Sequence, residues 1–137
     1  PNEFLKIRSG KVFKKVLLET NCQNKVGLRT LKKNVIVPCV YDQINMKSKF
    51  IEVVENGKVG YFNYKGLEVI PCKFDWVFYD GQHILTGIDN EVGLFSANGE
   101  MLVPCRYSDI AIMDDIIVAM YNEKKHIYNL SGHLVLE

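Results

Sequence analysis

The sequence lacks any long uninterrupted run of apolar residues. A helix that spans a membrane needs roughly 18 to 20 of them, and charged residues interrupt every apolar stretch of this 137-residue chain. We therefore expect no transmembrane helix, and no signal-peptide core in the chain as given. These absences favour a cytoplasmic protein, and a secreted or periplasmic location stays open if the sequence is a fragment.

Cysteine is scarce, and its spacing is not that of a metal site. Three of the four cysteines, Cys39, Cys72 and Cys105, are separated by equal steps of 33 residues, and Cys22 stands outside this series. The chain has neither a C-x-x-C pair nor a Cys-His cluster at zinc spacing. We expect unpaired thiols that pack as small apolar side chains, with no metal, disulfide or cofactor, and reduced thiols suit the cytoplasm.

Catalytic signatures are missing as well. The sequence has no G-x-G-x-x-G and no phosphate-binding G-x4-G-K, and no serine or cysteine lies near a histidine in a nucleophile motif. His83, His126 and His133 are therefore interpreted as surface residues. The sequence predicts a protein that is not an enzyme.

A period of 33 residues organises the chain. Val-Gly and Pro-Cys both recur at this spacing, at Val26-Gly27, Val59-Gly60, Val92-Gly93, Pro38-Cys39, Pro71-Cys72 and Pro104-Cys105. Three full units align without a gap at residues 35–67, 68–100 and 101–133, and residues 134–137 begin a further, truncated unit. Residues 1–34 are interpreted as a degenerate capping repeat, in which Leu17, Leu18 and Glu19 fall in the expected columns. All units are expected to form one structural domain.

Within each unit the apolar pattern is that of short strands. Segments such as Phe50 to Val54 and Lys58 to Phe62 are rich in β-branched and aromatic residues. Asn56-Gly57 between them predicts a tight hairpin. We expect an all-β tandem array of about four hairpin-containing repeats, arranged as an open solenoid or a propeller-like arc, with the recurring Tyr41, Phe74 and Tyr107 in the core.

These motifs resemble the bacterial WG repeat, also called the KWG repeat. The resemblance rests on Val69-Ile70-Pro71, on the aromatic-Asp steps Tyr41-Asp42 and Phe74-Asp75, on the segment Asn56 to Phe62, and on Gly66. The chain departs from the family at the name-giving tryptophan, where it has Val26, Val59, Val92 and Lys125. The resemblance implies a binding or interaction module whose repeat carries no catalytic residues.

Residues that break the period are the candidate functional residues. The middle unit has Trp76, Phe78 and Tyr79 where its neighbours have smaller side chains, and Trp76 is the only tryptophan. Tryptophan and tyrosine are enriched at interfaces, so this segment predicts a surface that binds another protein or a small ligand. The alternatives are a cluster that fills a gap between units, and a glycan-handling or hydrolytic enzyme that uses Asp75, Asp80 or Asp109 beside Trp76.

Charge is distributed unevenly along the chain. Residues 1–34 hold nine basic and two acidic residues, a net charge of +7, while residues 35–137 carry −6. The acidic body disfavours nucleic acid as a partner, so the basic end is interpreted as a solvated cap that supports weak head-to-tail self-association. The candidate electrostatic contacts are Lys14, Lys15, Lys32 and Lys33.

Overall fold

The computed structural model describes residues 3–9, 12–21, 23–32 and 34–136, and every regular element among them is a β-strand. The predicted all-β fold is confirmed. The described part of the chain contains no helix that could cross a membrane.

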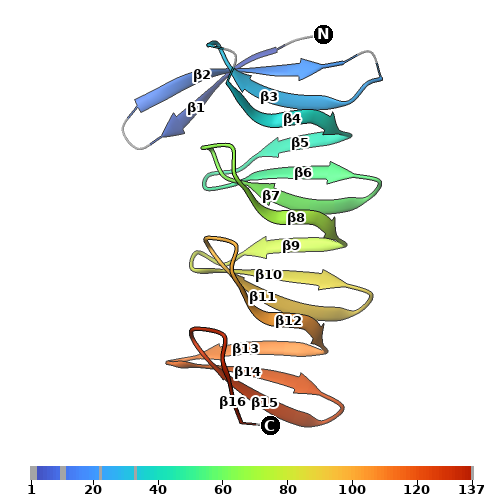
Figure 1. The fold of residues 1–137 in the computed structure, drawn as a ribbon, viewed down its shortest axis with the longest axis vertical. Helices are drawn as coiled ribbons and strands as arrows, with labels where there is room; N and C mark the ends of the chain where they lie inside the picture. Colours follow the sequence, from blue (N-terminus) through green and yellow to red (C-terminus); the bar gives the residue numbers. More distant parts are fainter. Residues whose placement is uncertain (1–2, 10–11, 22, 33, 137) are drawn as a thin grey trace. The chain divides into compact units, whose positions relative to one another are not determined.

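Four antiparallel sheets follow one another along the chain, and each consists of four consecutive strands (Figure 1). The first sheet holds β1 (Glu3–Ser9), β2 (Val12–Thr20), β3 (Val26–Thr30) and β4 (Val35–Tyr41). The second holds β5 (Gln43–Met46), β6 (Ile51–Glu55), β7 (Lys58–Phe62) and β8 (Glu68–Phe74). The third holds β9 (Trp76–Tyr79), β10 (His83–Ile88), β11 (Glu91–Ser96) and β12 (Met101–Tyr107). The fourth holds β13 (Asp109–Met113), β14 (Ile116–Tyr121), β15 (Lys124–Asn129) and β16 (Leu134–Leu136).

The sheets are offset from the units aligned in the sequence. Residues 35–67 contain the last strand of one sheet and the first three strands of the next, β4 to β7, and residues 68–100 and 101–133 repeat this arrangement. Residues 134–136 form β16, which pairs with β15 as the last strand of the fourth sheet. A period in a sequence has no intrinsic starting point, so the sheet boundary at the aromatic-Asp step is visible only in the structure.

The chain divides into two compact units, Pro1–Cys72 and Lys73–Glu137. In the first unit, buried side chains of the first and second sheets form one apolar cluster, with Val16, Leu28, Val37 and Ile51 at most 1% exposed. In the second unit, the third and fourth sheets form a comparable cluster. Its buried residues are Leu94, Leu102, Val103, Tyr107, Ile110, Ile117, Ala119 and Tyr128.

The recurring aromatic residues are core residues, as predicted. Tyr41, Phe74 and Tyr107 are 6%, 2% and 0% exposed. Each packs edge-on against another ring, and the ring centroids are 5.8 Å apart in Tyr41–Phe62, 5.9 Å in Phe74–Phe95 and 6.0 Å in Tyr107–Tyr128. Edge-to-face pairs at this separation are favourable beyond the area they bury. We call the place where one sheet ends and the next begins a corner. The aromatic position of the repeat supplies one such ring pair at each corner.

The predicted hairpin between β6 and β7 is confirmed. Asn56 and Gly57 both have positive φ, 52° and 76°, as a two-residue turn of this hand requires. The equivalent hairpins of the third and fourth sheets use non-glycine residues with the same backbone, Asp89 (52°), Asn90 (66°), Asn122 (47°) and Glu123 (65°).

Each Pro-Cys segment forms a bulge against a glycine. Val92 pairs with Tyr107 and Leu94 pairs with Val103, so two residues of β11 face four of β12. Gly93 lies at this irregularity, where an added Cβ would be 2.8 Å from the Cα of Cys105. Gly60 is equally crowded, with the Ile70 carbonyl oxygen at 2.6 Å. The Val-Gly column is thus explained by close approach of two backbones, because neither glycine has positive φ.

The first sheet departs from the predicted columns by one residue. Gly27 pairs with Glu19, whereas the equivalent glycines Gly60 and Gly93 pair with Val53 and Thr86. Counting back 33 residues from Val53 places Thr20 opposite this glycine, whereas the structure has Glu19 there. The predicted positions of Leu17, Leu18 and Glu19 in the repeat are therefore wrong by one residue. The connection between β2 and β3 accommodates the difference, because residues 21–25 replace a two-residue turn.

Candidate functional site

The aromatic strand surface, formed by Trp76 and Phe78, lies on β9. Tyr79, the third predicted residue, lies on the same strand but on the opposite face of the sheet, with Val77. Trp76 and Phe78 alternate with buried Val77 and are 42% and 58% exposed. Tyr79 is half-buried, and its hydroxyl donates a hydrogen bond to the Gly81 carbonyl, with 2.8 Å between the oxygens. The alternation of a strand therefore places both large aromatic side chains on the same face of the third sheet.

Trp76 packs over a glycine on the neighbouring strand. Trp76 and Gly87 are paired residues of β9 and β10, and a Cβ added to Gly87 would lie 2.0 Å from the indole Nε1. Gly87 is itself a break in the period, because Val54 and Met120 occupy its column. The ring thus fills the space that a side chain would occupy on β10, and one face of the indole is covered.

The equivalent strands of the second and fourth sheets carry polar or small side chains at these two positions. On β5, Gln43 Nε2 donates to Asn45 Oδ1 at 3.0 Å, and Asn45 Nδ2 donates to Glu52 Oε1 at 2.9 Å. On β13 the two positions hold Asp109 and Ala111, both exposed. Among the second, third and fourth sheets, only the third has an exposed aromatic pair at this position.

The carboxylates proposed to accompany Trp76 in an enzyme site hold backbone amides. Asp75 Oδ2 accepts the Asp89 N–H at 3.0 Å, and Asp80 Oδ1 accepts the N–H of Gln82 and of His83 at 2.8 and 2.7 Å. Asp109 Oδ1 accepts the following N–H at 2.9 Å. These contacts are those of turn and corner residues. Among the described residues, no three His, Cys, Asp or Glu side chains gather to hold a metal ion.

The basic residues fall mainly where side chains are not described. Lys14 and Lys15 lie on β2, and their side chains are outside the description; Lys33 is outside the described residues altogether. Lys32 is exposed. Cys22 is also outside the described residues.

The three recurring cysteines are half-buried, unpaired thiols. Each donates a hydrogen bond to a backbone carbonyl across the bulge, and the donor–acceptor distances are 3.0 Å for Cys39–Lys25, 3.1 Å for Cys72–Lys58 and 3.2 Å for Cys105–Glu91. Burial raises the pKa of the Cys72 and Cys105 thiols. Their place in the repeat is explained by this contact.

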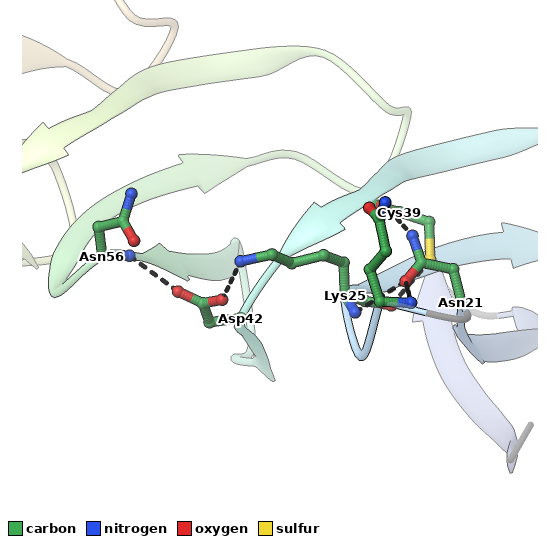
Figure 2. A network of polar contacts seen from close by, with 6 residues as sticks. Asn21, Lys25, Cys39, Asp42 and Asn56 are labelled. Atoms are coloured by element: carbon green, nitrogen blue, oxygen red, sulfur yellow. Dashed lines mark hydrogen bonds and ion pairs between the residues drawn. The ribbon is translucent and has the colours of Figure 1, made fainter.

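A polar network closes the corner between the first and second sheets (Figure 2). Asp42, directly after β4, forms an ion pair with Lys25 and accepts the Asn56 N–H at 2.8 Å. Lys25 and Asn56 belong to the turns that precede β3 and β7, so one carboxylate links turns of two sheets. The Lys25 hydrogen bond and the Asn56 amide hold the pKa of Asp42 below its usual range.

The corner between the third and fourth sheets carries different residues, which the sequence analysis missed. His126 occupies the column of Gly60 and Gly93, and its Nδ1 lies 2.9 Å from the Tyr107 hydroxyl. Tyr107 is hydrogen-bonded in turn to the Tyr128 hydroxyl at 2.5 Å and accepts from Arg106 Nη2 at 3.2 Å. The interpretation of all three histidines as surface residues is therefore wrong for His126 and His83, which are half-buried, while His133 is exposed.

No curated protein matches the chain. The model of the WG containing repeat family matches residues 31–58 and 60–81. These segments run from the end of β3 to the start of the turn after β9. The resemblance carried by the aromatic-Asp steps and the Asn-Gly hairpin is confirmed, and residues 31–81 carry the WG containing repeat.

Proposed function

We propose that the protein is a non-enzymatic binding module that recognises another protein through the aromatic strand surface. The observation that carries this proposal is the exposure of Trp76 and Phe78, 42% and 58%, on a strand whose equivalents in the neighbouring sheets are polar or small. Large aromatic side chains that are ordered but partly exposed are typical anchors of protein interfaces.

Two properties of the surface support its use in binding. The indole is held against Gly87, so little side-chain entropy is lost when a partner covers its other face. Phe78 is paired with the partly buried Leu85 of β10, so the exposed aromatic rings adjoin apolar surface. Binding is favoured over hydrolysis because Asp75 and Asp80 already accept backbone amides.

The repeat itself supplies variants that test this proposal. Trp76→Gln, Phe78→Asn and Gly87→Val together recreate the side chains of Gln43, Asn45 and Val54, which already form such a strand pair in the second sheet. Met101→Glu is the matched control, because Met101 is 60% exposed and Glu68 occupies the same column.

The experiment is affinity capture from the source lysate with three baits: the unchanged protein, the triple variant and Met101→Glu. We expect at least one protein that is captured by the unchanged chain and by Met101→Glu and is lost with the triple variant. Identical captured proteins for all three baits would contradict the proposal.

A further inference from the structure

A second, separate site lies at the corner between the third and fourth sheets. A cavity of about 280 Å³ opens there, and its lining residues are Glu91, Arg106, Tyr121 and His126. They come from β11, β12, β14 and β15, all within the unit Lys73–Glu137. The volume is close to the lower limit of small-molecule sites, so it suits one small ligand.

At the equivalent corner between the first two sheets, an ion pair joins two of the corresponding residues. These residues are Lys25 and Asp42 (Figure 2), and Gly60 occupies the column of His126. Moving along the chain by two periods replaces Lys25 with Glu91, Asp42 with Ser108 and Gly60 with His126. Ser108 Oγ donates to the carbonyl of Met120 on β14 at 3.1 Å, which is a contact with the fourth sheet. The ion pair that joins the first corner is thus absent from the second.

Two of the lining residues, Arg106 and His126, belong to one hydrogen-bonded group. His126 Nδ1 is bonded to the buried Tyr107 hydroxyl, and Tyr107 is bonded to Tyr128. The Arg106 guanidinium lies 5.3 Å from the centre of the Tyr107 ring and donates to its hydroxyl. Because each side chain has a hydrogen bond to the buried Tyr107 hydroxyl, the freedom of His126 and Arg106 is reduced before any ligand arrives.

The cavity has charges of both signs. Arg106 carries a permanent positive charge, and Glu91, also in the lining, supplies a carboxylate. No ion pair joins these two side chains in the part of the chain that the structure describes. Tyr121, 46% exposed, adds an aromatic wall.

We propose that this cavity binds a free amino acid. The ligand's carboxylate is held by Arg106 and by His126, its ammonium group by Glu91, and its side chain lies against Tyr121. Charge-assisted hydrogen bonds to both ends distinguish such a zwitterion from a simple anion, which Glu91 repels. This site is independent of the aromatic strand surface, so either proposal can fail without the other.

The test is a binding measurement with defined probes on the full chain. The L-amino acids are examined singly by saturation-transfer NMR and calorimetry, together with acetate, methylammonium, phosphate and glucose. We expect at least one amino acid to bind about tenfold or more tightly than either acetate or methylammonium, the two halves of its charged group. Glu91→Gln removes the ammonium partner and should weaken amino-acid binding by about tenfold. Acetate, which Glu91 repels, should bind to this variant at least as tightly as to the unchanged chain.

A second variant rebuilds the closed corner. Glu91→Lys, Ser108→Asp and His126→Gly together reproduce the side chains of Lys25, Asp42 and Gly60, and should abolish amino-acid binding. Lys124→Ala, exposed on β15 outside the lining, is the control and should bind as the unchanged chain does. If the triple variant does not fold, Glu91→Gln decides. The proposal is overturned if no amino acid binds, if acetate, phosphate or glucose binds as tightly as any amino acid, or if Glu91→Gln binds amino acids unchanged.

Discussion

The indole of Trp76 occupies the place of the side chain that Gly87 lacks. The two residues are directly paired on β9 and β10, and a Cβ on Gly87 would lie 2.0 Å from the indole nitrogen. Both residues break the 33-residue period, and they break it at the same cross-strand pair: Gln43–Val54 in the second sheet and Asp109–Met120 in the fourth. A large and a small residue have replaced two residues of intermediate size. The fit explains why Trp76 is held in place although nearly half of its surface is exposed.

This relationship predicts a non-additive pair of substitutions. Gly87→Val alone forces the indole away and should lower the free energy of unfolding by about 1–3 kcal/mol, the usual cost of overpacking. In the Trp76→Gln background the same change recreates the Gln43–Val54 pair and should cost little. Urea unfolding of the four proteins measures the coupling. Equal effects of Gly87→Val in both backgrounds would show that the ring does not depend on the glycine.

The Val-Gly column predicts a graded response to β-branched side chains. Gly60→Val or Gly93→Val places atoms inside the backbone of the facing bulge and should destabilise by about 3 kcal/mol, because neither strand can move without losing its pairing. His126→Val at the same column should cost only about 1 kcal/mol, the hydrogen bond to Tyr107. Gly57→Ala is the control, since nothing lies within 4 Å of its added Cβ and only its φ of 76° is unfavourable. Equal losses at positions 60, 93 and 126 would contradict a role in close backbone approach.

The recurring cysteines are predicted to react slowly with thiol reagents. Burial raises the pKa of Cys72 and Cys105, so little reactive thiolate is present at these two sites near neutral pH. All three thiols are half-buried and donate to backbone carbonyls, which limits the access of a reagent. Labelling in native buffer should be at least about tenfold slower than in denaturant. Mass spectrometry of digested protein resolves each site. Native rates that match the denatured rates at all three sites would contradict this assignment.

The Asp42 corner predicts a loss of stability in acid. Because Lys25 and the Asn56 amide lower the pKa of Asp42 in the folded protein, the contribution of this corner is fully present above the unfolded value, about 3.9, and is lost as the pH falls through the folded value. Asp42→Asn should therefore flatten the fall in the urea midpoint between pH 6 and pH 2. Asp115→Asn, at an exposed turn position, is the comparison and should retain it. An unchanged acid profile in Asp42→Asn would show that the ion pair and amide contact do not stabilise the fold.

The period in the sequence was sufficient to predict strands, hairpins and the aromatic core. Tyr41, Phe74 and Tyr107 recur because each corner has the same edge-on ring pair. The hairpin at Asn56-Gly57 was predictable because a tight turn requires positive φ at these two residues only. The register of β2 could not be predicted, because the five-residue connection before β3 absorbs an extra residue without changing any recognisable motif.

The sites were predictable only in part. Trp76 was recognised as a break in the period, but its partner Gly87 was not, since cross-strand pairing is needed to relate them. The cavity at Glu91, Arg106 and His126 was missed because its lining comes from four strands. A signal was nevertheless present in the sequence. Lys25, Asp42 and Gly60, at the corner between the first and second sheets, are replaced two periods later by Glu91, Ser108 and His126.

Fluorescence of Trp76 tests the central claim of binding through β9 most directly. Trp76 is the sole tryptophan of the chain and lies in the proposed interface, so its emission reports the site without background. A tryptophan-free preparation of the protein whose capture depends on Trp76 and Phe78 is added to the unchanged chain up to saturation. We predict that the emission shifts to shorter wavelength and that quenching by iodide falls, because the exposed face of the indole is covered. Unchanged emission and unchanged quenching in the saturated complex would contradict the account.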